Sequence, residues 1–157
     1  MSAAALIERL ALVPHPEGGW YRELYRSALR VQGPRGERAA LTSIYFLLEP
    51  GQVSRWHVVA AEEAWHFYAG SPLELFIYEP GARALRRERL GDVQGGAEPV
   101  SVVPAGCWQA ARPLAGYALL GCTVAPGFEF ADFRFVSDLP EHAEHFREQL
   151  RELRTLL

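Results

Sequence analysis

The middle of the chain consists of short apolar runs separated by Gly and Pro residues, whereas both ends carry helical patterns. Runs rich in Val, Ile, Phe, Tyr and Trp between turn residues are typical of β-strands. The runs are WYRELYRS, LTSIYFLL, SRWHVV, AWHFYAG, LELFIYEP, ALRRERL, PVSVVPAG, CWQAARP, YALLGCTV and FRFV. So many successive strands without intervening helices predict an all-β sandwich or barrel.

The N-terminal segment predicts a short helix. Ser2 is a favourable N-cap, and the helix is expected to run to about Leu12, because Pro14 and Pro16 prevent its continuation. The polar segment 30–39 (RVQGPRGERA) contains glycines and few apolar residues, so it predicts a loop.

The C-terminal segment predicts a second helix. Ser137 and Asp138 can cap it, and Pro140 suits its first turn. The apolar residues that follow at helical spacing are Phe146, Leu150, Leu153 and Leu157. Because the sequence shows no linker and no internal repeat, we expect a single domain over residues 1–157.

Composition narrows the choice of partners and compartment. The chain has 157 residues and a net charge of -3, which argues against nucleic-acid binding. Its two cysteines, Cys107 and Cys122, form no CxxC pair and fit a reduced compartment. Glu8 and Arg9 interrupt the apolar N-terminus, and no apolar run approaches the ~20 residues of a membrane span. We therefore expect a cytoplasmic protein with neither a nucleic-acid nor a membrane partner.

The segment 51–70 (GQVSRWHVVAAEEAWHFYAG) concentrates residues that bind metals or transfer protons. Strand alternation places three residues of SRWHVV on one face: Arg55, His57 and Val59. In EEAWHFYAG the shared face carries Glu63, Trp65 and Phe67, which turns Glu62 and His66 to the other side. A helix here would place Glu62 and His66 one turn apart, but the direct continuation into FYAGSPLELFIY favours a strand.

The spacing in this segment resembles the first motif of the cupins. Gly51, His57, Glu63 and Gly70 fall at the motif's intervals, and Val59 stands where the second His of the motif is expected. In the second motif the intervals of Pro104, Gly106 and Gln109 match, with Gln109 in place of His and Pro113 in place of a later Asn.

A wider set of stretches is similar to one small cupin family, long classified only as a domain of unknown function. They are PHPEGGWYRELYRS, TSIYFLL, SRWHVV, EEAWHFYAG, VVPAGCWQAA and GCTVAPGFEFADF, between Pro14 and Phe135. The resemblance implies a cupin-type double-stranded β-helix (jelly roll) with short N-terminal and C-terminal helices. It also implies a homodimer, which fits the four Trp, six Tyr and eight Phe, more than one small barrel interior absorbs.

The cupin metal site, with three His and one Glu, suits a divalent transition metal. Here His57 and Glu63 remain, Gln109 offers a poor amide ligand, and Val59 offers none. Only a β-bulge would bring His66 round to complete a site. We therefore predict a polar pocket without a metal cofactor, and a divalent metal remains the alternative.

Such a pocket can still transfer protons. His57 titrates near neutrality, and burial beside Trp65 and Phe67 would raise the pKa of Glu63, so these two are the candidate catalytic residues. The candidate ligand-binding residues are Tyr21, Glu23, Arg55, Trp65 and Gln109. Gln109 could orient a carbonyl or hydroxyl, and Arg55 could meet an anionic group or pair with Glu63. Tyr21, Glu23 and Tyr25 alternate toward the same face.

Other polar residues have simpler interpretations. His15, between two prolines, is expected to organise a turn, and PEGG supplies glycines for positive φ. His142 and His145 are expected on the solvated face of the C-terminal helix.

Three function classes are consistent with the sequence. One is a metal-independent isomerase or epimerase acting on a small polar, sugar-like or anionic molecule. The others are a non-catalytic binding module for a small ligand and a metal-dependent cupin enzyme.

Overall fold

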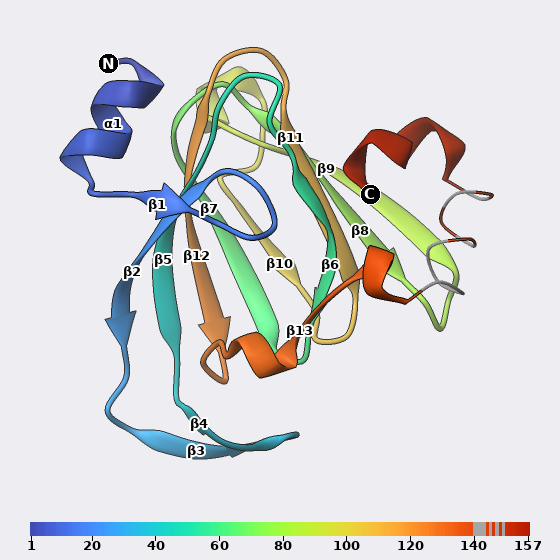
Figure 1. The fold of residues 1–157 in the computed structure, drawn as a ribbon. Helices are drawn as coiled ribbons and strands as arrows, with labels where there is room; N and C mark the ends of the chain where they lie inside the picture. The colour runs from blue at the N-terminus through green and yellow to red at the C-terminus, as the bar shows by residue number, and fades with distance from the viewer. Residues whose placement is uncertain (140–143, 145, 147, 149) are drawn as a thin grey trace.

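Two antiparallel β-sheets face each other and enclose the interior of a jelly roll, in a computed structural model that describes residues 1–139, 144, 146, 148 and 150–157 (Figure 1). The six-stranded sheet has the order β1 (Val13–Pro14), β2 (Trp20–Arg26), β5 (Thr42–Leu48), β12 (Ala118–Ala125), β7 (Glu62–Gly70) and β10 (Val100–Val103). The five-stranded sheet has the order β13 (Phe133–Phe135), β6 (Ser54–Val59), β11 (Trp108–Pro113), β8 (Leu73–Glu79) and β9 (Ala84–Leu90). The jelly roll predicted from the sequence is confirmed, and each predicted strand run overlaps one of these strands.

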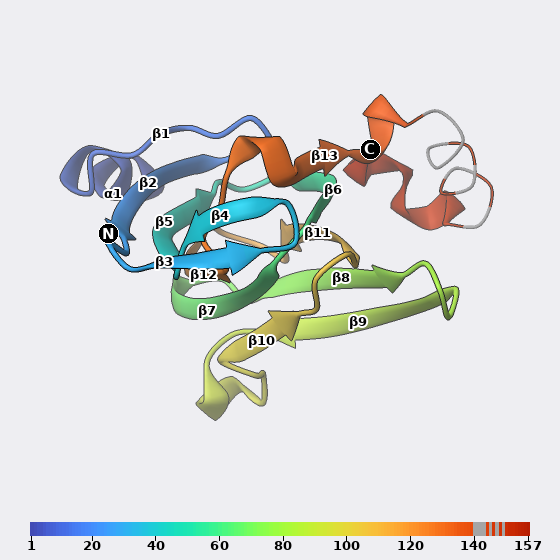
Figure 2. The same cartoon turned by 90° about the horizontal axis from the view of Figure 1, so that it is seen from below.

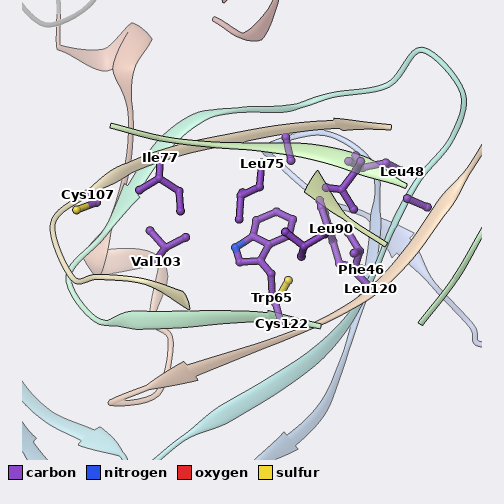
Figure 3. Packing of buried hydrophobic residues seen from close by; sticks show 13 residues of the cluster. Phe46, Leu48, Trp65, Leu75, Ile77, Leu90, Val103, Cys107, Leu120 and Cys122 are labelled. Atoms are coloured by element: carbon purple, nitrogen blue, oxygen red, sulfur yellow. The ribbon is translucent and has the colours of Figure 1, made fainter. Parts of the chain in front are cut away.

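Alternation along the strands builds the interior. On β8, Leu73, Leu75 and Ile77 point inward, whereas Phe76 and Tyr78 belong to a cluster on the outer face. Trp65 is fully buried, and Figure 3 shows its indole at the centre of the inner cluster. The cluster also contains Phe46, Leu48, Leu90, Val103, Cys107, Ala111, Ala118, Leu120 and Cys122. Large side chains from both sheets thus fill one part of the barrel.

Helical segments cover the outer faces of the two sheets. Helix α1 (Ala3–Arg9) packs Leu6 and Ile7 near Leu47 and Leu119 of the six-stranded sheet. Ser2 accepts a hydrogen bond from the Ala5 amide at 3.3 Å, which confirms the predicted cap. The helix ends before the predicted Leu12 because Ala11 takes a positive φ of 50°, which breaks the helical path.

The described residues of the C-terminal segment cover the outer face of the five-stranded sheet. Phe146, Leu153 and Leu156 are buried against a cluster that includes Trp56 and Trp108. Ser137 and Asp138 lie in a 3₁₀ turn, η3 (Val136–Asp138), and residues 151–156 form another, η4 (Arg151–Leu156). Much of the predicted helix, with His142 and His145, lies outside the described residues. Two further 3₁₀ turns are η1 (Val93–Gly95) and η2 (Phe130–Asp132).

The loop predicted for residues 30–39 is wrong, because this segment forms a two-stranded sheet of β3 (Arg30–Gly33) and β4 (Gly36–Ala39). The hairpin extends from β2 and β5 at one end of the barrel (Figures 1 and 2). Arg38 anchors it through a bidentate pair with Asp132 of η2, at 2.7 and 2.9 Å. Its polar sequence reflects exposure rather than irregular structure. Among the described residues, no helix is long and apolar enough to cross a membrane.

Candidate functional site

A cavity of about 230 Å³ opens between the sheets where the apolar packing of the interior ends. Its inner part carries four titratable side chains that are largely withdrawn from solvent: His15, Glu17, His57 and Glu63. Its walls are mostly apolar and aromatic, formed by Ala11, Val13, Tyr21, Thr42, Ile44, Phe46, Val59, Cys122, Val124, Phe128, Phe130 and Phe133. Arg22, Glu23, Arg26 and Glu129 complete the lining. A small polar molecule fits this combination of a polar floor and apolar walls.

His57 is held in one tautomer by its own strand. The side chain projects from β6 and is 1% exposed, and its ring stacks on Phe133 at 5.1 Å between centroids. Its Nδ1 lies 2.7 Å from the Arg55 carbonyl oxygen. Because a carbonyl can only accept, Nδ1 carries the proton and, in the neutral ring, Nε2 keeps a free lone pair. Nε2 lies 3.4 Å from Glu17 Oε2, so it faces the other titratable groups.

The loop between β1 and β2 brings Glu17 and His15 into the cavity. It closes on itself through hydrogen bonds from the His15 amide to the Gly19 carbonyl, 2.9 Å, and from the Gly18 amide to the His15 carbonyl, 3.1 Å. A Cβ at Gly18 would lie 2.1 Å from the Val53 carbonyl oxygen, so the close approach of this loop requires glycine. The turn expected for this segment is therefore present, but it also carries two site residues.

Arg55 fastens this loop to the barrel. Its amide donates to the Glu17 carbonyl at 2.9 Å, and its guanidinium donates to the Pro16 carbonyl at 2.6 Å. The guanidinium also lies over the Phe135 ring, 4.3 Å from its centroid. Arg55 does not line the cavity, so the structure places it as a support for the loop rather than as an anion receptor.

Glu17 contacts three side chains inside the site. The Ser54 hydroxyl donates to Oε1 at 2.8 Å, while Oε2 lies 3.4 Å from His57 Nε2 and 3.6 Å from His15 Nδ1. His15 Nδ1 accepts from the Glu17 amide at 3.1 Å, which leaves Nε2 of a neutral His15 as a donor. Strand periodicity could not find these residues because they belong to a loop. The available signal was a His and a Glu within a Pro- and Gly-rich segment beside a strand.

Glu63 is oriented by a chain of buried hydrogen bonds. The Trp65 indole donates to Gln109 Oε1 at 2.8 Å, and Gln109 Nε2 donates to Glu63 Oε2 at 2.6 Å. The Cys122 thiol is a further hydrogen-bond partner of Glu63. Because both ends of the Gln109 amide are occupied, this side chain positions Glu63 and does not reach the cavity.

Burial shifts the pKa values of these four groups in the directions that favour their neutral forms. Desolvation raises the pKa of Glu63 from 4.5 to about 7, against the opposing effect of His57, and it also raises the pKa of Glu17. It lowers the pKa of His57 and of His15. An acid and a base are thereby brought toward the same pH range inside one cavity.

The mouth of the cavity is shaped by a β-bulge in β2. Tyr21 and Glu23 line the cavity as expected, but the register with β5 shifts between Glu23 and Tyr25. Arg26 therefore turns inward, and Tyr25 is 55% exposed, so its predicted inward orientation is wrong. Arg26 donates to Glu23, at 2.8 and 3.0 Å, and to Glu129, at 2.9 Å, which ties β2 to the segment after β12.

The seven predicted site residues thus fall into two groups. His57, Glu63, Tyr21 and Glu23 line one cavity. Arg55, Trp65 and Gln109 lie behind it, as supports for the loop and for Glu63. His66 stays outside the lining, because the bulge in β7 falls after it, opposite the step from Leu119 to Leu120.

A family model described as Cupin superfamily (DUF985) matches residues 4–136 of the chain. This protein is a cupin. Two solved structures are 35% identical to it: a hypothetical protein from Leishmania major and a protein from Shewanella oneidensis. The first covers 90% of this chain and 94% of its own length with a TM-score of 0.80, and the second covers 99% and 94% with a TM-score of 0.83.

Oxalate decarboxylase from Bacillus subtilis shares the fold at a TM-score of 0.61, with 16% identity over 92% of this chain and 36% of its own. At that identity the likeness extends to the fold alone. None of the curated proteins compared with the sequence is a match.

The donor set of this cupin does not fit the metal site of three His and one Glu. Val59 does face the cavity, but it has no lone pair, and the Gln109 amide is committed to Trp65 and Glu63. In the described part of the chain, no three His, Cys, Asp or Glu side chains are arranged to hold a metal ion.

Proposed function

We propose that this cupin is an isomerase or epimerase that transfers protons on a small polar molecule bound in the cavity. One observation carries the proposal: the lone pair of His57 Nε2 and the carboxyl group of Glu63 belong to one cavity floor. Burial raises the pKa of Glu63 to about 7 and lowers the pKa of His57, which favours a protonated carboxyl group beside a neutral imidazole. A general base and a general acid near neutrality are what such a reaction requires.

In the proposed reaction His57 acts as the base. Nε2 removes a proton from a carbon next to the carbonyl of the ligand, while protonated Glu63 donates its proton to the carbonyl oxygen to give a neutral enediol. The His57 imidazolium then returns a proton to carbon, at the other carbon or from the other face, while the Glu63 carboxylate takes a hydroxyl proton of the enediol as the carbonyl re-forms. Both groups are thereby regenerated and the isomer is released. The Arg55 carbonyl stabilises the imidazolium that forms, because Nδ1–H already points at it.

The other site residues support this chemistry. Gln109 and Cys122 hold Glu63, and Glu17 lies beside His57 Nε2, where it can stabilise the imidazolium. Tyr21 and Glu23 at the wall and mouth can bind hydroxyl groups. An anionic ligand fits poorly because four acidic side chains line the cavity, Arg55 lies outside the lining, and Arg26 is already paired with Glu23 and Glu129.

The test is solvent-proton exchange. Purified protein is incubated in D₂O with a panel of small aldoses, ketoses and their amino derivatives, and deuterium incorporation is followed by NMR. We expect exchange with at least one compound, and a loss of at least about a hundredfold in His57→Ala and Glu63→Gln. The matched control is Glu62→Gln, which changes the adjacent, exposed glutamate and should keep full exchange.

Two results would contradict the proposal. Equal exchange in the wild type and in His57→Ala would place the chemistry elsewhere. Saturable ligand binding in the cavity without any exchange would favour the non-catalytic binding module, in which the same side chains only recognise the ligand.

We also propose that this cupin is a homodimer. The outer face of the six-stranded sheet exposes Leu24, Tyr68, Val100 and Val102, and β10 is an unpaired edge. Association through this region would cover both the apolar side chains and the edge. Light scattering at micromolar concentration should give twice the chain mass in the wild type and a monomer in Val102→Asp. A monomeric wild type would contradict the proposal.

A further inference from the structure

The charges around the cavity are unbalanced. Four carboxylates line it, from Glu17, Glu23, Glu63 and Glu129, against the two guanidinium groups of Arg22 and Arg26. Arg26 is committed to Glu23 and Glu129 through hydrogen bonds of 2.8 to 3.0 Å, and Arg22 lies over Tyr45, 5.7 Å from its ring centroid. At the mouth the two guanidinium groups balance Glu23 and Glu129, so the acidic groups without an arginine are Glu17 and Glu63 at the floor.

Among the described residues, the potential cations at the floor of the cavity are His15 and His57, which lie 3.6 and 3.4 Å from Glu17, and burial lowers the pKa of both and so favours their neutral forms. The chain contains no lysine, so no side-chain ammonium can reach Glu17 or Glu63. Among the described residues, the hydrogen-bonding partners of these two carboxylates are Ser54, Gln109 and Cys122, all uncharged. Two carboxylates that are each 7% exposed would normally be paired with a cation in a folded protein.

The aromatic walls of the cavity also favour a cation as the ligand. Aromatic rings of Tyr21, Phe46, Phe128, Phe130 and Phe133 surround the polar floor. The faces of aromatic rings carry negative potential and attract ammonium groups, most strongly where water is excluded. A cavity with aromatic walls and buried carboxylates thus offers a cation two kinds of contact, and it offers an anion neither.

We infer that the ligand of this cavity carries a positively charged amine, which Glu17 binds at the floor between the aromatic walls. Glu63 is the proton donor while it is protonated and adds a second negative charge once it is ionised. The inference rests on the cavity proposed above as the active site, and it narrows the substrate class to small amino compounds such as amino sugars or amino ketones. An ammonium group next to the reacting carbonyl also makes the neighbouring C–H more acidic, which suits a neutral imidazole base.

The experiment compares three compounds that share a cyclohexyl ring and carry a positive, a neutral or a negative group. Binding of cyclohexylammonium, cyclohexanol and cyclohexanecarboxylate to the full chain is measured by calorimetry at a pH of about 8, above the raised pKa of Glu63. We expect the ammonium ion to bind at least about tenfold more tightly than the alcohol, and the carboxylate to bind most weakly. Equal affinities for the ammonium ion and the alcohol, or no binding of the ammonium ion, would overturn the inference.

Variants locate the effect in the cavity. Glu17→Gln and Glu63→Gln keep the side-chain shape but remove a charge, so each should reduce the preference for ammonium to about threefold or less. Glu62→Gln should retain the full preference, because Glu62 is exposed and outside the lining. A preference that survives both Glu17→Gln and Glu63→Gln would place the ammonium site elsewhere and contradict the inference.

Binding of a metal ion by the carboxylates at the cavity floor is a competing outcome. If Zn²⁺ or Mn²⁺, added to chelator-treated protein, bound with higher affinity and displaced cyclohexylammonium, the carboxylates would serve a metal and the inference would be wrong. Proton exchange separates this test from that of the proposed function. Charge-selective binding without proton exchange would contradict the proposed function and leave this inference standing. Proton exchange on neutral sugars that bind as tightly as their amino derivatives would contradict this inference and leave the proposed function standing.

Discussion

The two ends of the barrel interior share the strands β5, β7 and β12 but carry opposite kinds of side chain. At one end, inward residues of β5 and β12 such as Leu48 and Leu120 are fully buried and pack around Trp65. At the other end, the next inward positions surround a cavity of about 230 Å³ with carboxylates and imidazoles at its floor. One end gains stability from apolar packing, and the other holds groups that are costly to bury.

The boundary between the two ends lies within single strands. On β7, Glu63 lines the cavity while Trp65, two residues further and on the same face, fills the core. Gln109 bridges them by accepting from the Trp65 indole and donating to Glu63. The packed position of Trp65 therefore fixes Gln109, and Gln109 in turn orients Glu63. Core packing at the apolar end thus determines part of the site geometry at the polar end.

The largest effect is expected from removing the centre of the apolar end. Trp65→Ala should lower the free energy of unfolding by about 3–5 kcal/mol, because it leaves a large cavity in a packed core. Trp65→Phe should cost less, since it keeps a ring but leaves Gln109 Oε1 without its donor. Chemical denaturation measures both. If Trp65→Ala cost less than about 1 kcal/mol, the packed end would not be the source of stability.

The fold could be predicted largely because this apolar end follows strand periodicity. Runs such as LELFIYEP and SRWHVV alternate between inner and outer faces, and each is a strand where expected. The hairpin of β3 and β4 escaped prediction because it is exposed and has few apolar residues to show a period. The inward turn of Arg26 escaped because a β-bulge shifts the alternation by one residue, and no local residue pattern announces it.

A smaller effect concerns the charge at the polar end. The pKa of Glu63 is raised from 4.5 to about 7, so between these pH values the folded protein keeps a proton that the unfolded chain has lost. The contribution of Glu63 to the free energy of unfolding then falls as the pH rises from about 5 to 7, by an amount on the order of 3 kcal/mol, whereas the lowered pKa values of His57 and His15 act in the opposite direction.

Glu63→Gln tests this directly, because the amide keeps the shape and cannot ionise. Its stability should depend less on pH over this range, and above about pH 7 it should exceed that of the wild type, while proton exchange is lost. Denaturation curves measured from pH 5 to 8 provide the comparison, with Glu62→Gln as the control that retains the wild-type slope. Identical slopes in all three proteins would show that Glu63 is not buried as an acid.

The candidate site could be predicted only in part, because strand periodicity applies to its residues on strands and not to those in a loop. His57 and Glu63 lie on strands, where alternation gave the neighbours that share their faces and the resemblance to the cupin motif implied that both point inward. His15 and Glu17 lie in a loop whose path depends on glycines at positive φ and on the anchor provided by Arg55. Such a path depends on contacts far along the chain, which a local pattern does not contain.

Breaking the bridge between the two ends should have a still smaller effect. Gln109→Ala removes the partner of both Trp65 and Glu63 and should lower the free energy of unfolding by about 1–3 kcal/mol. It should also raise the pKa of Glu63 further, because the amide hydrogen bond stabilises the carboxylate. Gln94→Ala, which truncates an exposed amide, should change neither quantity. An unchanged Glu63 titration by NMR in Gln109→Ala would mean that the two ends act independently.

The smallest effect is expected at Cys122, which belongs both to the apolar cluster and to the lining of the cavity. Its thiol is a hydrogen-bond partner of Glu63 and lowers the pKa of that carboxyl group. Cys122→Ser replaces a weak donor with a stronger one of similar size, so the pKa of Glu63 should fall below its wild-type value. The cost in stability should stay at about 1 kcal/mol or less, because the new hydroxyl keeps a partner. NMR titration of Glu63 in both proteins measures the shift, and the alkaline limb of the exchange rate, where Glu63 loses its proton, should move to lower pH with it. A higher pKa in Cys122→Ser would show that the boundary residue acts through packing rather than through its hydrogen bond.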